Sequence, residues 1–263
     1  KARVFARRTA STVFLWGLVT AIFVSHWSWA YLGLIAVLIL IATIEYFAML
    51  RTAKVACFPR FGIVAAVAYC AALHWYFLNG KPPHPDLDAF AVFAVLAGSF
   101  TLQLRQPIRG LESLLSVAAN VLGFVYIAVL FNFAARLLFV VENPAPGTIG
   151  DQGAFLLLWL LAVTKFTDMG AYLVGSLIGR HKMIPHVSPG KTWEGFGGAL
   201  FFSQLAGIGL FLAFPTQLAA LGHLGHVVTL GVLLALLAVV GDLAESIVKR
   251  ALDAKDSGQM LPG

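Results

Sequence analysis

Two short stretches in the C-terminal half combine carboxylate, basic and hydroxyl side chains in a largely apolar chain. The first stretch extends from Thr167 to Gly195 and contains lysine, arginine, histidine, serine and threonine side chains, two carboxylates and several glycines. Cations and exposed backbone N–H groups complement the charge of phosphate oxygens, so this composition favours binding of a phosphorylated substrate. The competing interpretation is a charged loop that only fixes the topology of a membrane protein.

One tripeptide of the first stretch, Gly190-Lys191-Thr192, resembles the end of a nucleotide-binding P-loop. That motif also requires a glycine five positions before its second glycine. Pro185 occupies this position, so the sequence excludes a Walker-type nucleotide site.

The second stretch begins at Gly241, directly after an apolar segment. If the segment stays helical, its polar residues share one face within an arc of about 140°. These residues are Asp242, Glu245, Ser246, Lys249, Arg250, Asp253 and Asp256. Carboxylates on this face could hold a divalent cation, while the lysine and arginine could reach phosphates. The competing interpretation is an amphipathic helix with i,i+4 pairs, which is weaker for Asp242 because this residue ends an apolar span.

The composition indicates that lipid surrounds most of the chain. Its 263 residues are 60% hydrophobic and 11% charged, with a mean hydropathy of +0.87, whereas soluble domains carry about 25% charged residues. A spanning helix needs about 20 apolar residues, so we predict an all-α integral membrane protein with about eight transmembrane helices and room for a ninth. The predicted spans are Thr12–His26, Trp29–Leu50, Phe61–Phe77, Asp88–Leu104, Ser113–Phe133, Gly153–Thr167, Phe196–Phe214 and His226–Glu245.

We expect one integrated membrane domain, in which residues 1–150 supply N-terminal transmembrane helices and residues 151–263 supply the chemistry. The basic residues before the first apolar run resemble the start of a signal peptide. That run continues without a clear small-residue cleavage site, so we interpret it as a retained span. Cys57 lies beside a basic loop and Cys70 lies within an apolar run, so we expect no disulfide framework.

The distribution of lysine and arginine predicts the orientation of the spans. With the N-terminus inside and eight alternating spans, nearly all of the 18 lysine and arginine residues fall on inner loops. Only Lys81 falls outside, while Arg136 and Lys165 lie within spans. Positive residues mark the cytoplasmic side, so the active site and both ends of the chain are expected there. Because the net charge of +6 is dispersed over short loops, we expect no nucleic-acid partner.

The two polar stretches resemble the motifs of the phosphatidate cytidylyltransferase (CDP-diacylglycerol synthase) family. The family pattern S-x-x-K-R-x4-K-D-x-G-x-x-L-P-G is matched, after Gly241-Asp242-Leu243, by Ser246, Lys249, Arg250, Lys255, Asp256, Gly258, Leu261, Pro262 and Gly263. The first stretch resembles the family's D-x-x-A-Y and S-P-x-K-T-x-E-G patterns. The matching residues are Asp168, Ala171, Tyr172, Gly175, Gly179, Arg180, His181, Lys182, Ser188, Pro189, Lys191, Thr192, Glu194, Gly195, Gly197 and Gly198. The resemblance begins at about residue 153; the earlier half matches only as generic spans.

The resemblance implies a metal-dependent nucleotidyltransferase that joins phosphatidate to CTP, releases pyrophosphate and leaves CDP-diacylglycerol in the membrane. It implies Mg2+ as the cofactor, a bacterial plasma membrane as the location, and membrane lipid as a partner; a second metal ion and a homodimer are compatible with it. The implied catalytic residues are Asp242, Lys249, Arg250, Lys255 and Asp256, with Asp242 and Asp256 as metal ligands. The implied substrate-binding residues are Ser188, Lys191, Thr192, Glu194, Asp168, Tyr172 and Ser246.

The family pattern continues beyond the position of Gly263 with H-G-G and D-R-x-D, and the resemblance implies that this later aspartate shares the metal with Asp242. We therefore expect the polypeptide to continue past Gly263. Three alternatives stay open: a CTP-dependent polyprenol kinase or a cytidylyltransferase for another lipid phosphate, a lipid-binding paralogue without activity, and a transporter. A transporter predicts internal repeats and broken helices, and the sequence shows neither.

Overall fold

The computed structural model describes residues 17–141, 145 and 147–252, which form a nearly all-helical chain. Six helices in this part of the chain are long and apolar enough to cross a membrane. They are Ser28–Thr52, Pro59–Leu78, Leu111–Leu138, Asp151–Ile178, Trp193–Ala213 and Leu224–Ala251. The predicted class, a helical integral membrane protein, agrees with these helices, whereas the number of eight spans stays a prediction.

Two of the eight predicted spans have no counterpart among the six long helices. The span predicted over Thr12–His26 begins outside the described residues, although residues 17–25 are helical. The span predicted over Asp88–Leu104 corresponds to α4 (Leu87–Gln103), which has only 17 residues. At 1.5 Å per residue, α4 rises about 26 Å, less than the hydrocarbon core of about 30 Å.

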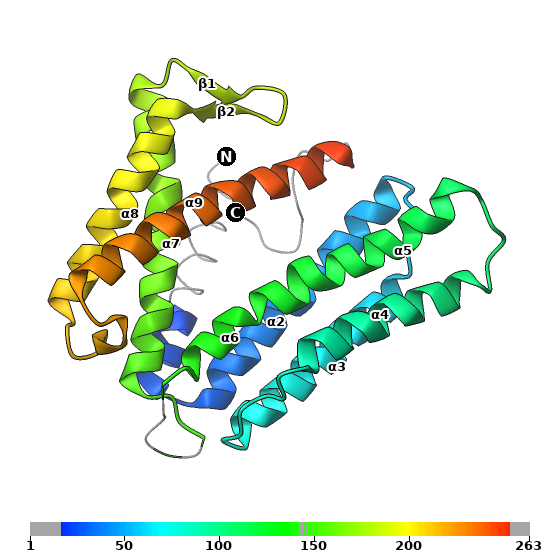
Figure 1. Cartoon of the computed structure of the whole chain (residues 1–263), viewed down its shortest axis with the longest axis horizontal. Coiled ribbons are helices and arrows are strands. Elements are labelled where there is room, and N and C mark those ends of the chain that lie inside the picture. Colours follow the sequence, from blue (N-terminus) through cyan, green and yellow to red (C-terminus); the bar gives the residue numbers. More distant parts are fainter. Residues whose placement is uncertain (1–16, 142–144, 146, 253–263) are drawn as a thin grey trace. The chain divides into compact units, whose positions relative to one another are not determined.

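The helices form two compact units, which meet in the sequence between Ile149 and Gly150. The first unit contains α2 (Ser28–Thr52), α3 (Pro59–Leu78), α4 (Leu87–Gln103), α5 (Leu111–Gly123), the π-helical segment η1 (Phe124–Val129) and α6 (Phe133–Leu138) (Figure 1). Glycines let large rings approach the helix backbones: Tyr46 lies against Gly123, and Phe47 lies against Gly62. Helices that carry few polar groups thereby pack closely in the first unit.

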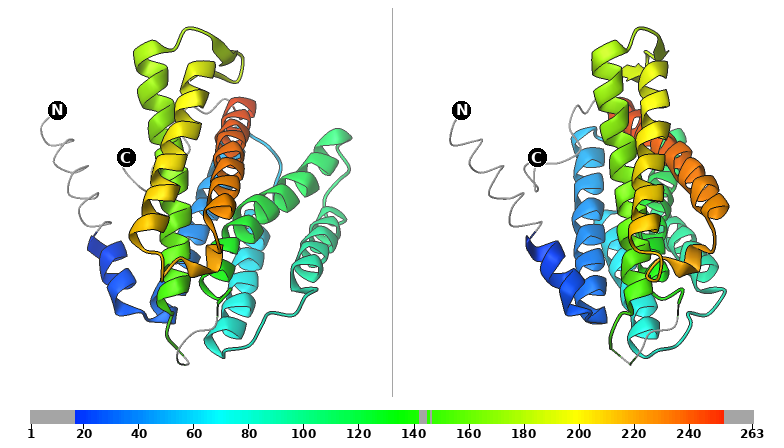
Figure 2. Two further views of the ribbon diagram at one scale, coloured as in Figure 1. Left: turned by 60° about the vertical axis from the view of Figure 1, so that its left-hand side comes forward. Right: turned by 90° about the vertical axis from the view of Figure 1, so that its left-hand side faces the viewer.

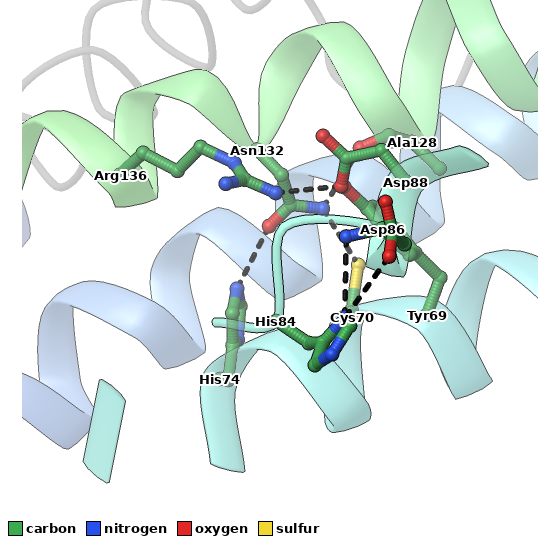
Figure 3. Close-up of polar contacts among 9 residues, drawn as sticks. All are labelled: Tyr69, Cys70, His74, His84, Asp86, Asp88, Ala128, Asn132 and Arg136. Carbon is green, nitrogen blue, oxygen red and sulfur yellow. Dashed lines mark hydrogen bonds and ion pairs between the residues drawn. The ribbon is translucent and has the colours of Figure 1, made fainter. Parts of the chain in front are cut away.

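An ion pair joins two helices in the interior of the first unit (Figure 3). Asp88, in the first turn of α4, lies 2.6 Å from the guanidinium of Arg136 in α6. The same carboxylate oxygen accepts a 2.7 Å hydrogen bond from the hydroxyl of Tyr69 in α3. Both charged side chains are about 30% exposed, at 31% and 29%. Three helices are thus tied together by one carboxylate.

A second polar cluster lies beside this ion pair and is completely enclosed. The amide of Asn132, which is 0% exposed, donates to the carbonyl oxygen of Ala128 at 2.8 Å and to the thiol of Cys70 at 3.2 Å. Its carbonyl oxygen lies 2.9 Å from Nε2 of His74. Asn132 lies three residues after Val129, the last residue of the π-helical segment, and its side chain satisfies the carbonyl group of Ala128 within that segment. Cys57 and Cys70 are both free thiols.

The second unit is built on two long helices that pack along most of their length. Its elements are α7 (Asp151–Ile178), β1 (Lys182–Ile184), β2 (Ser188–Thr192), α8 (Trp193–Ala213), the short 3-10 helix η2 (Ala219–Leu221) and α9 (Leu224–Ala251). Figures 1 and 2 show α7 and α8 side by side. Their backbones touch at Gly170 and Gly198, where a β-carbon on Gly198 would lie 2.6 Å from the carbonyl oxygen of Gly170. Farther along, the indole of Trp159 donates to the carbonyl oxygen of Gly207.

Two expectations about the polar stretches need correction. The first stretch was expected to leave the helix at Thr167, but α7 continues to Ile178. The apolar pattern persists through Leu173 and Val174, and the glycines of this segment serve the contact with α8 instead of ending the helix. The short hairpin of β1 and β2 also departs from the expected all-α architecture. The second stretch stays helical to Ala251, beyond the predicted end of the span at Glu245, so the condition for a shared polar face is met up to Ala251.

Because α7 and α8 lie so close together, the adjacent glycines Gly197 and Gly198 should differ in how well they tolerate substitution by alanine. We expect Gly198→Ala to lower the free energy of unfolding by about 1–3 kcal/mol, because the added methyl group overpacks a filled interface against Val174 and Gly170. Gly197 has no atom within 4 Å of an added β-carbon, so Gly197→Ala is the matched control and should not destabilise the protein. Thermal unfolding of both variants in detergent checks this; equal midpoints would contradict the packing argument.

The ion pair of the first unit predicts a second stability effect. Arg136→Met should lower the free energy of unfolding by about 1–3 kcal/mol, because Asp88 keeps its charge but loses its cationic partner. Arg105→Met, at an exposed arginine after α4, is the control. Adding Asp88→Asn to Arg136→Met should restore part of the loss, since no unpaired charge remains. A double variant whose effect equals the sum of the single effects would rule out the coupling.

Candidate functional site

The two polar stretches come together within the second unit, around the β-hairpin. β1 pairs with β2 in antiparallel fashion, with Lys182 opposite Thr192 and Ile184 opposite Ser188. The hairpin connects the C-terminal end of α7 to the N-terminal end of α8 (Figure 1). Three predicted substrate-binding residues therefore lie on one short strand: Ser188, Lys191 and Thr192.

Thr192 is built into the start of α8. Its hydroxyl accepts a 3.1 Å hydrogen bond from the backbone N–H of Gly195, as an N-cap residue does. Thr192 is 4% exposed and packs against Gly175 and Gly179. A β-carbon on Gly179 would lie 2.7 Å from the Thr192 hydroxyl, whereas one on Gly175 would lie 3.2 Å from it. Gly179 is therefore needed to admit Thr192, and Gly175 leaves room for it. In this geometry the hydroxyl is already occupied by the helix cap, and its predicted contact with substrate stays a prediction.

The carboxylate of Glu194 is directed at the end of α7. It accepts hydrogen bonds from the backbone N–H groups of Arg180 at 3.1 Å and His181 at 3.2 Å. Nδ1 of the His181 ring lies 2.6 Å from its other oxygen. Both oxygens of Glu194 are thus engaged by the chain itself, and the predicted contact of Glu194 with substrate is not tested by this arrangement.

An ion pair between Lys191 and Asp242 links the two motif stretches. The ammonium group of Lys191 in β2 lies 2.9 Å from the carboxylate of Asp242 in α9. It also donates a 3.2 Å hydrogen bond to the carbonyl oxygen of Val239, one turn earlier on the same helix. The Lys191 side chain is 20% exposed and that of Asp242 is 52% exposed. The carboxylate is therefore accessible from outside while the lysine is largely enclosed.

Further charges surround this ion pair. Asp168 in α7 lies within electrostatic range of Lys165, Lys191, Asp242 and Glu245. Three elements of the second unit thus contribute to one charged cluster: α7, β2 and α9. Lys165 stands one turn before Asp168 and is the nearest source of positive charge on the same helix. Such a mixed cluster of carboxylates and cations can exchange partners with an incoming phosphate group.

The polar face of α9 forms over the described residues, because the helix continues to Ala251. Lys249 pairs with Glu245 at 2.7 Å in an i,i+4 ion pair, and the Ser246 hydroxyl donates to the carbonyl oxygen of Asp242 at 2.8 Å. The predicted catalytic residue Arg250 is exposed at the end of this helix. The i,i+4 pair was the competing interpretation of this face, and the structure shows it together with the link from Asp242 to Lys191.

One predicted site residue lies apart from the charged cluster, and two others are outside the described residues. Tyr172 lies one turn after Asp168 on α7 and is 77% exposed. Lys255 and Asp256 lie outside the described residues. Among the described residues no group of three histidine, cysteine, aspartate or glutamate side chains could hold a metal ion. The described acidic residues therefore do not amount to a metal site by themselves.

Sequence reasoning missed two participants of this site. His181 was matched to the family pattern but was given no role, and the structure pairs it with Glu194. The carbonyl oxygen of Val239 binds Lys191, although no side-chain pattern could have indicated it. The only signal for His181 was its place in the motif, next to two basic residues.

Comparisons with known proteins agree with the motif resemblance. A phosphatidate cytidylyltransferase of Mycobacterium tuberculosis (strain ATCC 25618 / H37Rv) is 37% identical over 147 residues, which are 56% of this chain and 40% of that protein. A phosphatidate cytidylyltransferase of Staphylococcus aureus (strain COL) is 40% identical over 126 residues, which are 48% of this chain and 45% of that protein. The uncharacterized protein YnbB of Escherichia coli (strain K12) is 36% identical over 180 residues, or 67% of this chain and 56% of that protein.

These matches cover roughly half the length of each relative. The sequence model of the Cytidylyltransferase family matches a much longer part of the chain, residues 6–263, and so extends over both units. The matched residues contain the hairpin, the polar face of α9 and the ion pair of Lys191 with Asp242. This chain belongs to the Cytidylyltransferase family.

Proposed function

We propose that the chain is the catalytic region of a phosphatidate cytidylyltransferase, which converts CTP and phosphatidate into CDP-diacylglycerol and pyrophosphate. The observation that carries this proposal is the 2.9 Å ion pair of Lys191 with Asp242, which joins the two polar stretches in one cluster. Support also comes from the family match and from relatives named phosphatidate cytidylyltransferase.

The reaction requires one displacement at phosphorus. An oxygen of the lipid phosphate attacks the α-phosphorus of CTP, and the bond from this phosphorus to the oxygen that bridges to the β-phosphorus breaks. Pyrophosphate leaves with the electron pair of that bond, so no covalent enzyme intermediate is needed. Such a transfer depends on in-line positioning and on neutralisation of negative charge more than on proton abstraction.

The chain supplies cations for this neutralisation. Lys191 and Lys249 are each held by a carboxylate in the structure, by Asp242 and Glu245 respectively. Phosphate groups offer several charged oxygens to such ammonium groups, so binding of CTP and lipid would draw the lysines from carboxylate to phosphate. Arg250, exposed at the end of α9, would provide a planar guanidinium for two oxygens of one phosphate.

A magnesium requirement is part of this proposal, with Asp242 and Asp256 as the ligands. Asp242 offers carboxylate oxygens, the type of ligand that Mg2+ prefers. Its side chain is 52% exposed and is therefore accessible to an ion. Asp256 lies outside the described residues, and the described acidic residues do not form a complete site. No step of the reaction is therefore assigned to the metal ion.

The proposed location of the site suits its two substrates. Phosphatidate is held in the bilayer by two acyl chains, whereas CTP arrives from water. A charged cluster on long apolar helices would place the reaction at the membrane interface. We propose that this interface is the cytoplasmic one, because lysine and arginine favour that side.

A product assay tests the proposed function directly. We expect purified full-length protein in detergent, given labelled CTP, phosphatidate and magnesium, to produce lipid-extractable cytidine and pyrophosphate in equal amounts. EDTA should abolish both products, and added magnesium should restore them. Phosphorylated lipid together with CDP would instead identify a lipid kinase. No turnover with any lipid phosphate would favour a binding protein over an enzyme.

The ion pair predicts which carboxylate matters most in that assay. Asp242→Asn keeps the shape of the side chain but removes its charge, so it should lower turnover about 100-fold or more. Asp86→Asn is the matched control, because Asp86 is 83% exposed and lies in the first unit, outside the charged cluster. Near-normal turnover of Asp242→Asn, with expression and unfolding midpoint unchanged, would refute the assignment of Asp242.

A further inference from the structure

The base of the hairpin is closed by contacts that converge on one carboxylate. Glu194 accepts hydrogen bonds from the N–H groups of Arg180 and His181 and from the His181 ring. We call these contacts, with the residues Arg180, His181 and Glu194, the Glu194 clasp. Glu194 stands in the first turn of α8, yet its side chain is only 22% exposed. It is therefore turned toward the end of α7 and not toward solvent.

His181 is held at three points of its structure. Its backbone N–H and its ring bind Glu194, while its carbonyl oxygen accepts a 2.9 Å hydrogen bond from the N–H of Trp193. β1 begins directly after His181, and β2 ends directly before Trp193. The contacts of His181 thus hold the start of β1 beside the end of β2.

The clasp lies close in sequence to the lysine that reaches α9. Lys191 precedes Glu194 by three residues, and between them Thr192 is buried as the cap of α8. Because the chain is held at Thr192 and at Glu194, the Lys191 side chain has little freedom in the direction in which it projects from β2. The side chain of Lys191 then bridges to Asp242 and to the carbonyl oxygen of Val239. Displacing the strand would break both contacts at once.

Glu194 is poorly suited to contact a phosphorylated substrate. Its two oxygens already accept hydrogen bonds from the chain, and its negative charge would repel a phosphate group. A carboxylate that binds backbone N–H groups makes strong, charge-assisted hydrogen bonds, which suits a fixed structural anchor.

We propose that Glu194 and His181 are positioning residues, whose clasp holds β2 so that Lys191 stays on Asp242. The importance of this lysine for turnover rests on the proposed function, but the positioning itself does not. In this view the Glu194 carboxylate acts through Lys191 and makes no contact with CTP or lipid. The His181 ring in turn acts through Glu194.

Lysine labelling tests the positioning without any substrate. Full-length protein in detergent is treated briefly with an acetylating reagent, and labelling of Lys191 is measured by mass spectrometry relative to Lys182, an exposed lysine of the same hairpin. Glu194→Gln should raise this ratio about tenfold, since the charge-assisted hydrogen bonds of the clasp are lost. Asp242→Asn, which removes the ion pair itself, should raise it by a similar factor. His181→Ala should have a smaller effect, because two backbone hydrogen bonds to Glu194 remain.

A glutamate at the same helix position elsewhere serves as the control. Glu112 is the second residue of α5, as Glu194 is of α8, so Glu112→Gln removes an equivalent charge from a helix N-terminus. It should leave the labelling of Lys191 unchanged. The double variant of Glu194→Gln with His181→Ala should label no faster than Glu194→Gln alone, because the ring acts only through the carboxylate.

The outcomes separate this inference from the proposed function. Unchanged Lys191 labelling in Glu194→Gln would overturn the inference that the clasp positions Lys191, even if the variant had lost turnover. A wild-type protein that makes no CDP-diacylglycerol would refute the proposed function, while the labelling would still test the clasp. If Glu194→Gln does not fold, as judged by its unfolding midpoint in detergent, His181→Ala decides: a labelling ratio equal to that of the wild type would overturn the inference.

Discussion

The polar part of the second unit depends on a contact between two backbones. α7 and α8 touch at Gly170 and Gly198, where neither residue has space for a β-carbon. Helices this close have little freedom to slide, because any larger side chain would meet the opposite backbone. The contact fixes where the C-terminal end of α7 stands beside the start of α8. The hairpin, the cap at Thr192 and the direction of Lys191 all follow from the relative position of those two ends.

The two units use ion pairs in different ways. In the first unit, Asp88 is bound by both Arg136 and Tyr69, so its carboxylate is engaged by two neighbouring helices. In the second unit, Lys191 is mostly enclosed while Asp242 keeps half of its side chain accessible. A carboxylate that is engaged by two neighbouring helices stabilises their packing arrangement. A pair with one accessible partner can be opened by a competing charge, as binding of a phosphorylated substrate requires.

The sequence predicted those parts of the structure that leave a local, periodic pattern. The spacing of Asp242, Ser246 and Lys249 placed them on one face provided that the helix continued past Glu245, and α9 does continue to Ala251. The continuation of α7 beyond Thr167 was missed, because glycines and a carboxylate suggested a loop. These glycines make room for α8, and this role depends on a partner helix that local sequence does not show.

Contacts between residues that are distant in the sequence could not be predicted from local patterns. The motif placed Lys191 and Asp242 in the same active site, but their direct ion pair depends on how β2 lies against α9. The roles of Thr192 as a helix cap and Glu194 as an acceptor for Arg180 and His181 were also missed. Hydroxyl and carboxylate groups serve helix ends and substrates equally well, so residue type alone does not distinguish the two uses.

The π-helical segment η1 has a consequence for how the first unit tolerates changes in length. A π-helical turn contains one residue more than an α-helical turn, so η1 (Phe124–Val129) holds an inserted residue within a continuous helix. Deleting one residue there would convert the π-helical turn to regular α-helical winding, and the helix after it would keep nearly its present orientation because the lost residue is the extra one. Asn132 and Arg136 would therefore stay directed at His74 and Asp88, to which they now bind. A one-residue deletion in the regular helix α5 would instead rotate everything after it by about 100°. The first unit is therefore more tolerant of a deletion within η1 than of one in α5.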